Sequence, residues 1–254
     1  MSLKRRAITG VIWNAIGTVG AGLFHFGLIM ILARILTPSD FGLIELLVIF
    51  TVISQSFIDG GFSQALIRDQ NATQKDLSTI FFFNLILAII IYLILFFSSP
   101  YISGFYEDMS LTKLSRFVFI VIIFYSLSIV QNALFTKKLD FKPIAIVNIL
   151  SLLISGSVSV WMAYNGYKVW ALAVSLVLFS FLKMILFWTL SSWVPSLVFS
   201  FNSLKKYFKF GGYLLISTLL DKTISNLESL FIGRVYTKAD LGYFSQARKI
   251  NAFL

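Results

Sequence analysis

Residues 78–100 read STIFFFNLILAIIIYLILFFSSP and contain no charged side chain. A helix of this length rises about 34 Å, enough to cross the hydrocarbon core of a bilayer. Comparable apolar runs occupy residues 11–33, 41–58, 116–135, 143–164, 169–192 and 210–232, and an eighth begins near residue 240. These runs predict an all-α, multi-pass membrane helix bundle with about seven crossings.

The composition excludes a soluble globular domain. Hydrophobic residues make up 58% of the 254 residues and charged residues 13%, against about 45–50% and about 25% in soluble domains. The 21 Lys and Arg exceed the 11 Asp and Glu, giving a net charge of +10. In a membrane protein such an excess indicates basic loops on the cytoplasmic side rather than nucleic-acid binding.

The distribution of basic residues predicts the orientation of the chain. Connections on the side of the amino terminus are rich in Lys and Arg, with Lys137, Lys138, Lys205 and Lys206 among them. The opposite connections contain fewer basic residues. We therefore expect the amino terminus on the cytoplasmic side.

An internal repeat divides the chain. Residues 33–45 read ARILTPSDFGLIE, and residues 233–245 read GRVYTKADLGYFS. A shift of 200 residues superposes four identical pairs: Arg34 and Arg234, Thr37 and Thr237, Asp40 and Asp240, Gly42 and Gly242. Asp40 and Asp240 are expected to cap the helices that follow. The alternative is a chance match between two helix corners with similar cap chemistry.

A genuine repeat would have consequences for the domain organisation. An even number of helices lies between the two copies, so both have the same orientation, as in the parallel repeats of some secondary transporters. The predicted domains are a six-helix lobe over residues 1–200 and the start of a second lobe over residues 201–254.

Polar residues inside the apolar runs are candidates for a substrate cavity, because burying them in a bilayer is costly. Asn14, Thr18 and His25 lie within about 40° of one another on the first helix. Asp221 and Glu228 lie one heptad apart on the seventh. These two stripes predict a hydrated cavity shared by both lobes, and the alternative is polar contact between packed helices.

Other ionisable residues extend this candidate set. Lys222 adjoins Asp221, and Arg248 and Lys249 lie well inside the eighth helix. Glu45 is expected near the outer surface, where its solvation is cheap.

The sequence contains no recognisable catalytic constellation. A GxxxxGK[ST] phosphate loop and cysteine are both absent, and His25 is the single histidine. We therefore expect no enzyme, no bound metal and no cofactor. A membrane-embedded acyl- or glycosyltransferase or a polysaccharide polymerase is the alternative from another class, but the connections are short for such a site.

Several segments together resemble a known family. They are TPSDFG at residues 37–42, DGGFSQALIRDQNATQKDLSTIFFFNL at 59–85, FKP at 141–143 and GYFSQARK at 242–249. The sequence resembles the N-terminal half of bacterial polysaccharide and O-antigen repeat-unit flippases. These belong to the multidrug/oligosaccharidyl-lipid/polysaccharide superfamily, whose members have two helical lobes around a central cavity.

The resemblance implies a function in polysaccharide or lipopolysaccharide biosynthesis. The substrate would be an undecaprenyl-pyrophosphate-linked oligosaccharide, moved across the bacterial inner membrane by alternating access, with H⁺ or Na⁺ as a possible coupling ion. Basic residues suit the pyrophosphate; the candidates are Arg34, Arg68, Lys222, Arg248 and Lys249. Asp221 and Glu228 are candidates for coupling or for orienting these bases. A multidrug/cation antiporter of the same superfamily is the alternative, although it would favour acids over bases in its cavity.

Overall fold

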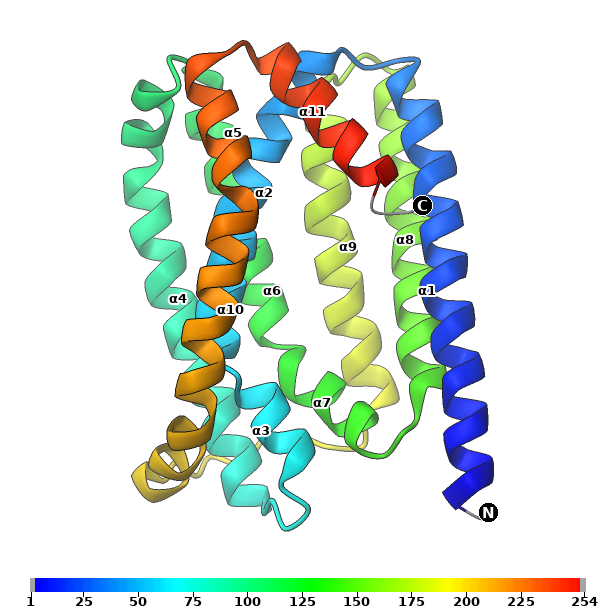
Figure 1. Cartoon of the computed structure of the whole chain (residues 1–254), viewed down its shortest axis with the longest axis vertical. Helices are drawn as coiled ribbons and strands as arrows, with labels where there is room; N and C mark the ends of the chain where they lie inside the picture. Colours follow the sequence, from blue (N-terminus) through cyan, green and yellow to red (C-terminus); the bar gives the residue numbers. More distant parts are fainter. Residues whose placement is uncertain (1–2, 252–254) are drawn as a thin grey trace.

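The computed structural model describes residues 3–251, and it describes the side chains of residues 9–209 and 211–248. Within this part the chain forms helices and connecting segments (Figure 1). The helices are α1 (Leu3–Ala33), α2 (Pro38–Asp59), α3 (Phe62–Arg68), α4 (Gln74–Phe105), α5 (Ser110–Val118), α6 (Val121–Ser126), α7 (Ile129–Lys137), α8 (Phe141–Tyr164), α9 (Val169–Leu190), α10 (Phe201–Val235) and α11 (Lys238–Asn251).

The long helices confirm the predicted multi-pass membrane bundle. Among the described residues, 5 helices are long and apolar enough to cross a bilayer, namely α1, α2, α4, α8 and α9. The segment from α5 to α7 makes a sixth span if its bent parts are counted together. The seventh predicted crossing corresponds to α10, which runs the length of the bundle (Figure 1) but is more polar than the others.

The fourth predicted crossing is not one continuous helix. It extends over 110–137 in three segments and bends by 40° between Ser126 and Ile129. The hydroxyls of Ser126 and Ser128 donate to the carbonyl oxygens of Ile123 and Tyr125, each at 2.8 Å. Such local bonds compete with the regular helical ladder, and serine is a common residue at helix bends. Hydropathy alone predicts the span but not its interruption.

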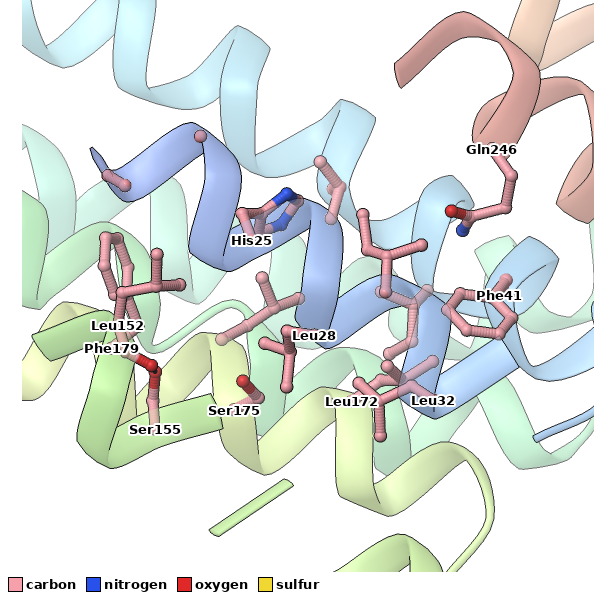
Figure 2. Close-up of a pocket in the computed structure, with 16 residues that line it drawn as sticks. His25, Leu28, Leu32, Phe41, Leu152, Ser155, Leu172, Ser175, Phe179 and Gln246 are labelled. Atoms are coloured by element: carbon pink, nitrogen blue, oxygen red, sulfur yellow. Dashed lines mark hydrogen bonds between the residues drawn. The ribbon is translucent and has the colours of Figure 1, made fainter. Parts of the chain in front are cut away.

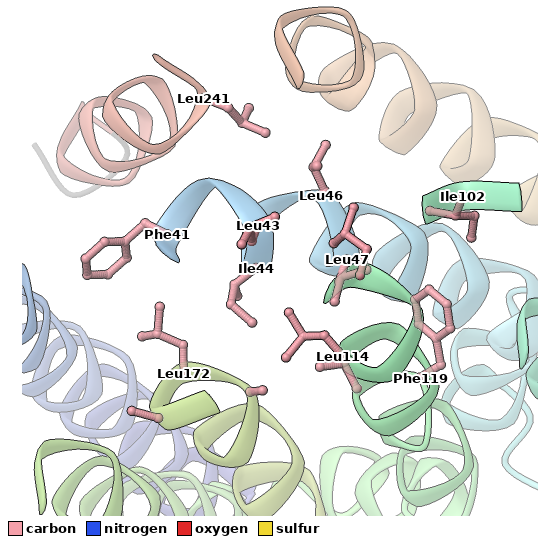
Figure 3. Close-up of a cluster of buried hydrophobic side chains, with 14 of the residues drawn as sticks. Phe41, Leu43, Ile44, Leu46, Leu47, Ile102, Leu114, Phe119, Leu172 and Leu241 are labelled. Carbon is pink, nitrogen blue, oxygen red and sulfur yellow. The ribbon is translucent and has the colours of Figure 1, made fainter. Parts of the chain in front are cut away.

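Close packing around α2 forms the core at the end of the bundle where α2 begins. We call this the corner end, and the opposite end, where α1 begins, the amino end. Figure 3 shows Leu46 and Leu47 of α2 among side chains from α4, α5, α9 and α11. Both leucines have 0% exposure. The buried cluster joins α11, which the repeat assigns to the second lobe, to helices of the first.

The helix α10 packs along α2, α3 and α4 and is held at both ends. At the amino end Asp69 accepts hydrogen bonds from Lys206 Nζ and Tyr207 Oη, each at 2.6 Å. These bonds lower the pKa of Asp69 to about 2. At the corner end Arg234 pairs with Glu107 at 3.1 Å. The helix α10 is thus held against the preceding helices by charge as well as by packing.

Glycines let α10 pack closely against the turn between α2 and α3. Gly60 and Gly61 have φ values of 52° and 73°, a left-handed conformation that reverses the chain between α2 and α3. A Cβ at Gly211 would lie 2.6 Å from the carbonyl oxygen of Gly60. Any side chain at Gly211 would therefore force α10 away from this turn.

Candidate functional site

The two repeat copies form matching helix corners. Thr37 Oγ1 donates to Asp40 Oδ2 at 2.7 Å, and Thr237 Oγ1 donates to Asp240 Oδ2 at 2.6 Å. In return, the backbone amides of Asp40 and Asp240 donate to the threonine hydroxyls at 3.3 and 3.2 Å. The prediction that Asp40 is the cap was wrong: Thr37 is the N-cap, and Asp40 completes a capping box from the N3 position.

The corners meet in a reciprocal crossing of α2 and α11. A Cβ at Gly42 would lie 1.9 Å from the carbonyl oxygen of Lys238, and a Cβ at Gly242 would lie 1.9 Å from that of Pro38. The two contacts are equivalent under the shift of 200: Gly42 corresponds to Gly242, and Pro38 corresponds to Lys238. This exchange is the signature of a local two-fold relation between the copies. It is possible only because neither glycine has a side chain.

An ion pair links the two copies just beyond this crossing. Arg248 of α11 donates from Nη2 to Glu45 Oε1 at 3.0 Å and to Asn226 Oδ1 at 3.3 Å. Its Nη1 donates to the carbonyl oxygen of Ser225 at 3.0 Å. The side chain of Glu45 is 4% exposed and that of Arg248 is 36% exposed. The expectation of a solvated Glu45 was therefore wrong, because α10 and α11 cover it.

The polar residues of α1 line two adjoining cavities. A cavity of 290 Å³ is bordered by Asn14 and Thr18, and one of 450 Å³ by His25. Both are bordered by Ala21, Leu152 and Phe179, so they adjoin along one side of α1. Figure 2 shows His25 at the larger cavity, which lies between α1, α2, α8, α9 and α11. The stripe predicted on the first helix thus faces a continuous recess.

The acidic residues of α10 lie elsewhere. Asn226 and Ser229 are buried, whereas Asp221 and Glu228 are exposed. At 100° per residue, the carboxylates lie about 80–160° from the buried pair, so they are on another side of α10, whereas Lys222 falls between Asn226 and Ser229. Lys222 lies 3.8 Å from Asp221. The described part of the chain does not bring these residues together with Asn14, Thr18 and His25.

The remaining basic candidates are dispersed. Arg34 is exposed at the corner end, and Arg68 is exposed at the end of α3, near the amino end (Figure 1). Lys249 belongs to α11, but its side chain lies outside the described side chains. Among these candidates, Arg248 contacts Glu45 of the first copy and Asn226 of α10.

Residues 31–254 match the family described as "Polysaccharide biosynthesis protein". The chain belongs to this family.

Relatives in this family are named for several surface polysaccharides. The chain is 28% identical over 251 residues to the teichuronic acid biosynthesis protein TuaB of Bacillus subtilis, covering 98% of this chain and 52% of the relative. It is 24% identical to the lipopolysaccharide biosynthesis protein WzxC of Escherichia coli, covering 98% and 51%. It is 23% identical to the succinoglycan biosynthesis transport protein ExoT of Rhizobium meliloti, covering 93% and 48%. The chain thus spans about half the length of these curated relatives.

A solved structure shows the same fold. It is an inward-facing conformation of a multidrug resistance MATE family transporter of the MOP superfamily. The match has a TM-score of 0.62 at 17% identity and covers 94% of this chain and 57% of that chain. The predicted MATE-like fold class is confirmed.

The sequence did not predict the positions of two polar residues of this chain. Glu45 was placed at the surface, and Gln246 was not singled out, although it borders the larger cavity. The repeat contained a signal for both, because the shift of 200 pairs Glu45 with Ser245 and Gln246 with Leu46. Where the shift aligns a polar residue with a residue of another kind, the two corners differ in chemistry.

Proposed function

We propose that this chain forms the first lobe, residues 1–200, and the start of the second lobe, residues 201–254, of a flippase for lipid-linked oligosaccharides. The transported molecule is an undecaprenyl-pyrophosphate-linked repeat unit. It moves from the cytoplasmic to the outer leaflet of the bacterial inner membrane by alternating access, in the service of surface polysaccharide biosynthesis. The amino end of the bundle faces the cytoplasm.

The reciprocal crossing of Gly42 and Gly242 is the observation that carries this proposal. It joins the two repeat copies at the corner end, around a local two-fold relation. Two lobes related in this way can move as rigid bodies about their contact, which is how repeats give alternating access. The larger cavity is bordered by Phe41 and Gln246 beside this contact, and the smaller one by Trp13 and Asn14, nearer the amino end.

The chemistry of the recess suits the two polar parts of the substrate. Arg248 borders neither cavity but lies on α11 two residues beyond Gln246, and it offers a planar guanidinium for the pyrophosphate, with Glu45 as its counter-ion when no substrate is bound. Asn14, Thr18 and His25 offer hydrogen-bonding groups for sugar hydroxyls. Asp221 and Glu228 are exposed on a side of α10 that differs from its buried side, and they are the candidates for coupling to H⁺ or Na⁺. Lys222 points between the buried Asn226 and Ser229 and is a further basic candidate for the pyrophosphate.

Deletion of the gene in a strain that makes the surface polymer tests the function. We expect lipid-linked repeat units to accumulate on the cytoplasmic leaflet and the surface polymer to disappear, with both restored by the complete gene. The distribution between leaflets is measured by accessibility of the sugars to an impermeant lectin in oriented vesicles. Unchanged polymer together with altered dye or drug resistance would contradict the flippase and favour the multidrug/cation antiporter.

A further inference from the structure

Gln246 of α11 is a buried amide that the fold does not satisfy. Its Oε1 and Nε2 are both shielded from solvent, and neither has a hydrogen-bond partner among the described residues. Leaving such groups buried and unpaired costs about 1–3 kcal/mol. Figure 2 shows the side chain extending from α11 toward the 450 Å³ cavity, which it helps to line.

The internal repeat supplies a comparison for this position. The residue 200 positions earlier is Leu46, which has 0% exposure and packs in the core of the corner end (Figure 3). A Cβ at Gly233 of α10 would lie 2.4 Å from Leu46 Cδ2. The corner therefore folds with an apolar side chain at this position. Glutamine in the second copy is not explained by packing, which points to a ligand.

The cavity is mainly apolar, with a small number of polar side chains that can fix the orientation of a ligand. Its walls are mainly aliphatic, with the rings of Phe41 and Phe179 and the polar side chains of His25 and Ser175. A sugar ring combines apolar C–H faces with an edge of adjacent hydroxyls, each of which donates and accepts. If the buried amide of Gln246 turns toward the cavity, one hydroxyl can donate to Oε1 while its neighbour accepts from Nε2. A hydrocarbon chain would leave both atoms unpaired.

We propose that this cavity is a subsite for one sugar residue of the transported oligosaccharide, held by the side-chain amide of Gln246 through two adjacent hydroxyls. The inference rests on the proposed function and adds to it the residue that recognises the sugar. The volume of 450 Å³ falls within the range of about 300–1,000 Å³ found for small-molecule sites.

The substitution Gln246→Leu, introduced into the complete gene, tests the subsite. Because Leu is the residue that the first copy places here, we expect the thermal stability of the purified protein to be unchanged or higher. Loss of two hydrogen bonds predicts about a tenfold decrease in surface polymer and in the lipid-linked oligosaccharide that co-purifies with the protein, measured by mass spectrometry. The same change at the exposed Gln70 is the matched control and should alter neither quantity.

The outcomes separate this inference from the function on which it rests. Failure of the wild-type gene to restore polymer to the deletion strain would overturn the flippase itself. If the wild-type gene restores polymer and Gln246→Leu gives the same polymer and the same co-purified lipid as the wild type, the sugar subsite alone is overturned. Increased polymer or co-purified lipid for Gln246→Leu would also overturn it, and would show that the cavity takes a hydrocarbon chain.

Discussion

At the scale of single residues, the contact between Glu45 and Arg248 stands out because it places two charges within a membrane bundle. Glu45 is 4% exposed, so its charge depends on nearby groups for compensation. Arg248 supplies it and is itself held by Asn226 and by the carbonyl oxygen of Ser225. The pair joins α2 to α11 and therefore helps to fix how these two helices lie against each other.

Substitutions at this pair should separate stability from transport. We expect Glu45→Leu to lower the free energy of unfolding by about 2 kcal/mol, because Arg248 then lacks its carboxylate but remains partly solvated. The double variant Glu45→Leu, Arg248→Met should recover most of this loss, since it leaves no uncompensated charge. Thermal unfolding in detergent gives the stability of each variant.

Transport should not recover in the double variant, because the proposed phosphate ligand is gone. Surface polymer produced by the complete gene carrying both changes measures this. A double variant no more stable than Glu45→Leu would show that the ion pair is not the cause of the loss, and full polymer would remove Arg248 from the proposed site.

At the scale of the helices, the helix starts follow a simple local pattern. The hydroxyls of Thr37 and Thr73 each accept a hydrogen bond from the backbone amide of an aspartate three residues later. Each hydroxyl also donates to the carboxylate of that aspartate. Thr237 repeats the arrangement. These boxes fix where α2, α4 and α11 begin. They are local, so the sequence reveals them.

The crossing of α2 and α11 should be sensitive to a single methyl group. Gly42→Ala would place Cβ against the carbonyl oxygen of Lys238, so the helices must move apart. We expect a loss of about 2 kcal/mol in the free energy of unfolding, comparable to the overpacking of a core. Gly27→Ala in α1 is the control, because a Cβ there meets nothing within 4 Å.

The control should be neutral or should stabilise the protein by about 0.5–1 kcal/mol, through the better helix propensity of alanine. The melting temperatures of both variants are compared with that of the wild type. Equal behaviour of the two alanine variants would mean that α2 and α11 do not cross as closely as the structure shows.

At the scale of the whole molecule, charge pairs hold α10 and α11 to the part of the chain that precedes them. Besides the contacts of Asp69 and Arg234, Lys238 of α11 pairs with Asp108 in the connection between α4 and α5. Burial raises the pKa of Asp108, but hydrogen bonds from Lys238 and Ser110 outweigh it, so the pKa lies below its ordinary value. Asp108 therefore remains ionised, and the contact lies beside the crossing at the corner end.

Exchange of these two charges tests whether the pair holds α11 to the connection between α4 and α5. Asp108→Lys places like charges together and should lower the free energy of unfolding by about 1–2 kcal/mol. The swap Asp108→Lys, Lys238→Asp restores opposite charges and should recover at least half of that loss. Thermal unfolding at low salt measures both variants. Absence of any recovery in the swap would mean that the two side chains do not pair.

The sequence by itself determined the membrane class, the long helices and the repeat of the corners. Each depends on interactions between residues close in the chain: apolar runs such as 78–100 and caps such as Thr37 with Asp40. Hydropathy could not show the bend between α6 and α7, where the hydroxyls of Ser126 and Ser128 bond to nearby carbonyl oxygens.

Only the tertiary structure decided which polar residues meet. Glu45 and Arg248 are 203 residues apart in the chain, and their contact follows from the crossing at Gly42 and Gly242. The same crossing brings Gln246 to the cavity beside His25, while Asp221 is exposed on another side of α10. The physical reason is that helical periodicity gives the direction of a side chain on its own helix, whereas its partner depends on how closely another helix can approach. That approach is set here by two glycines whose missing side chains let the repeats touch.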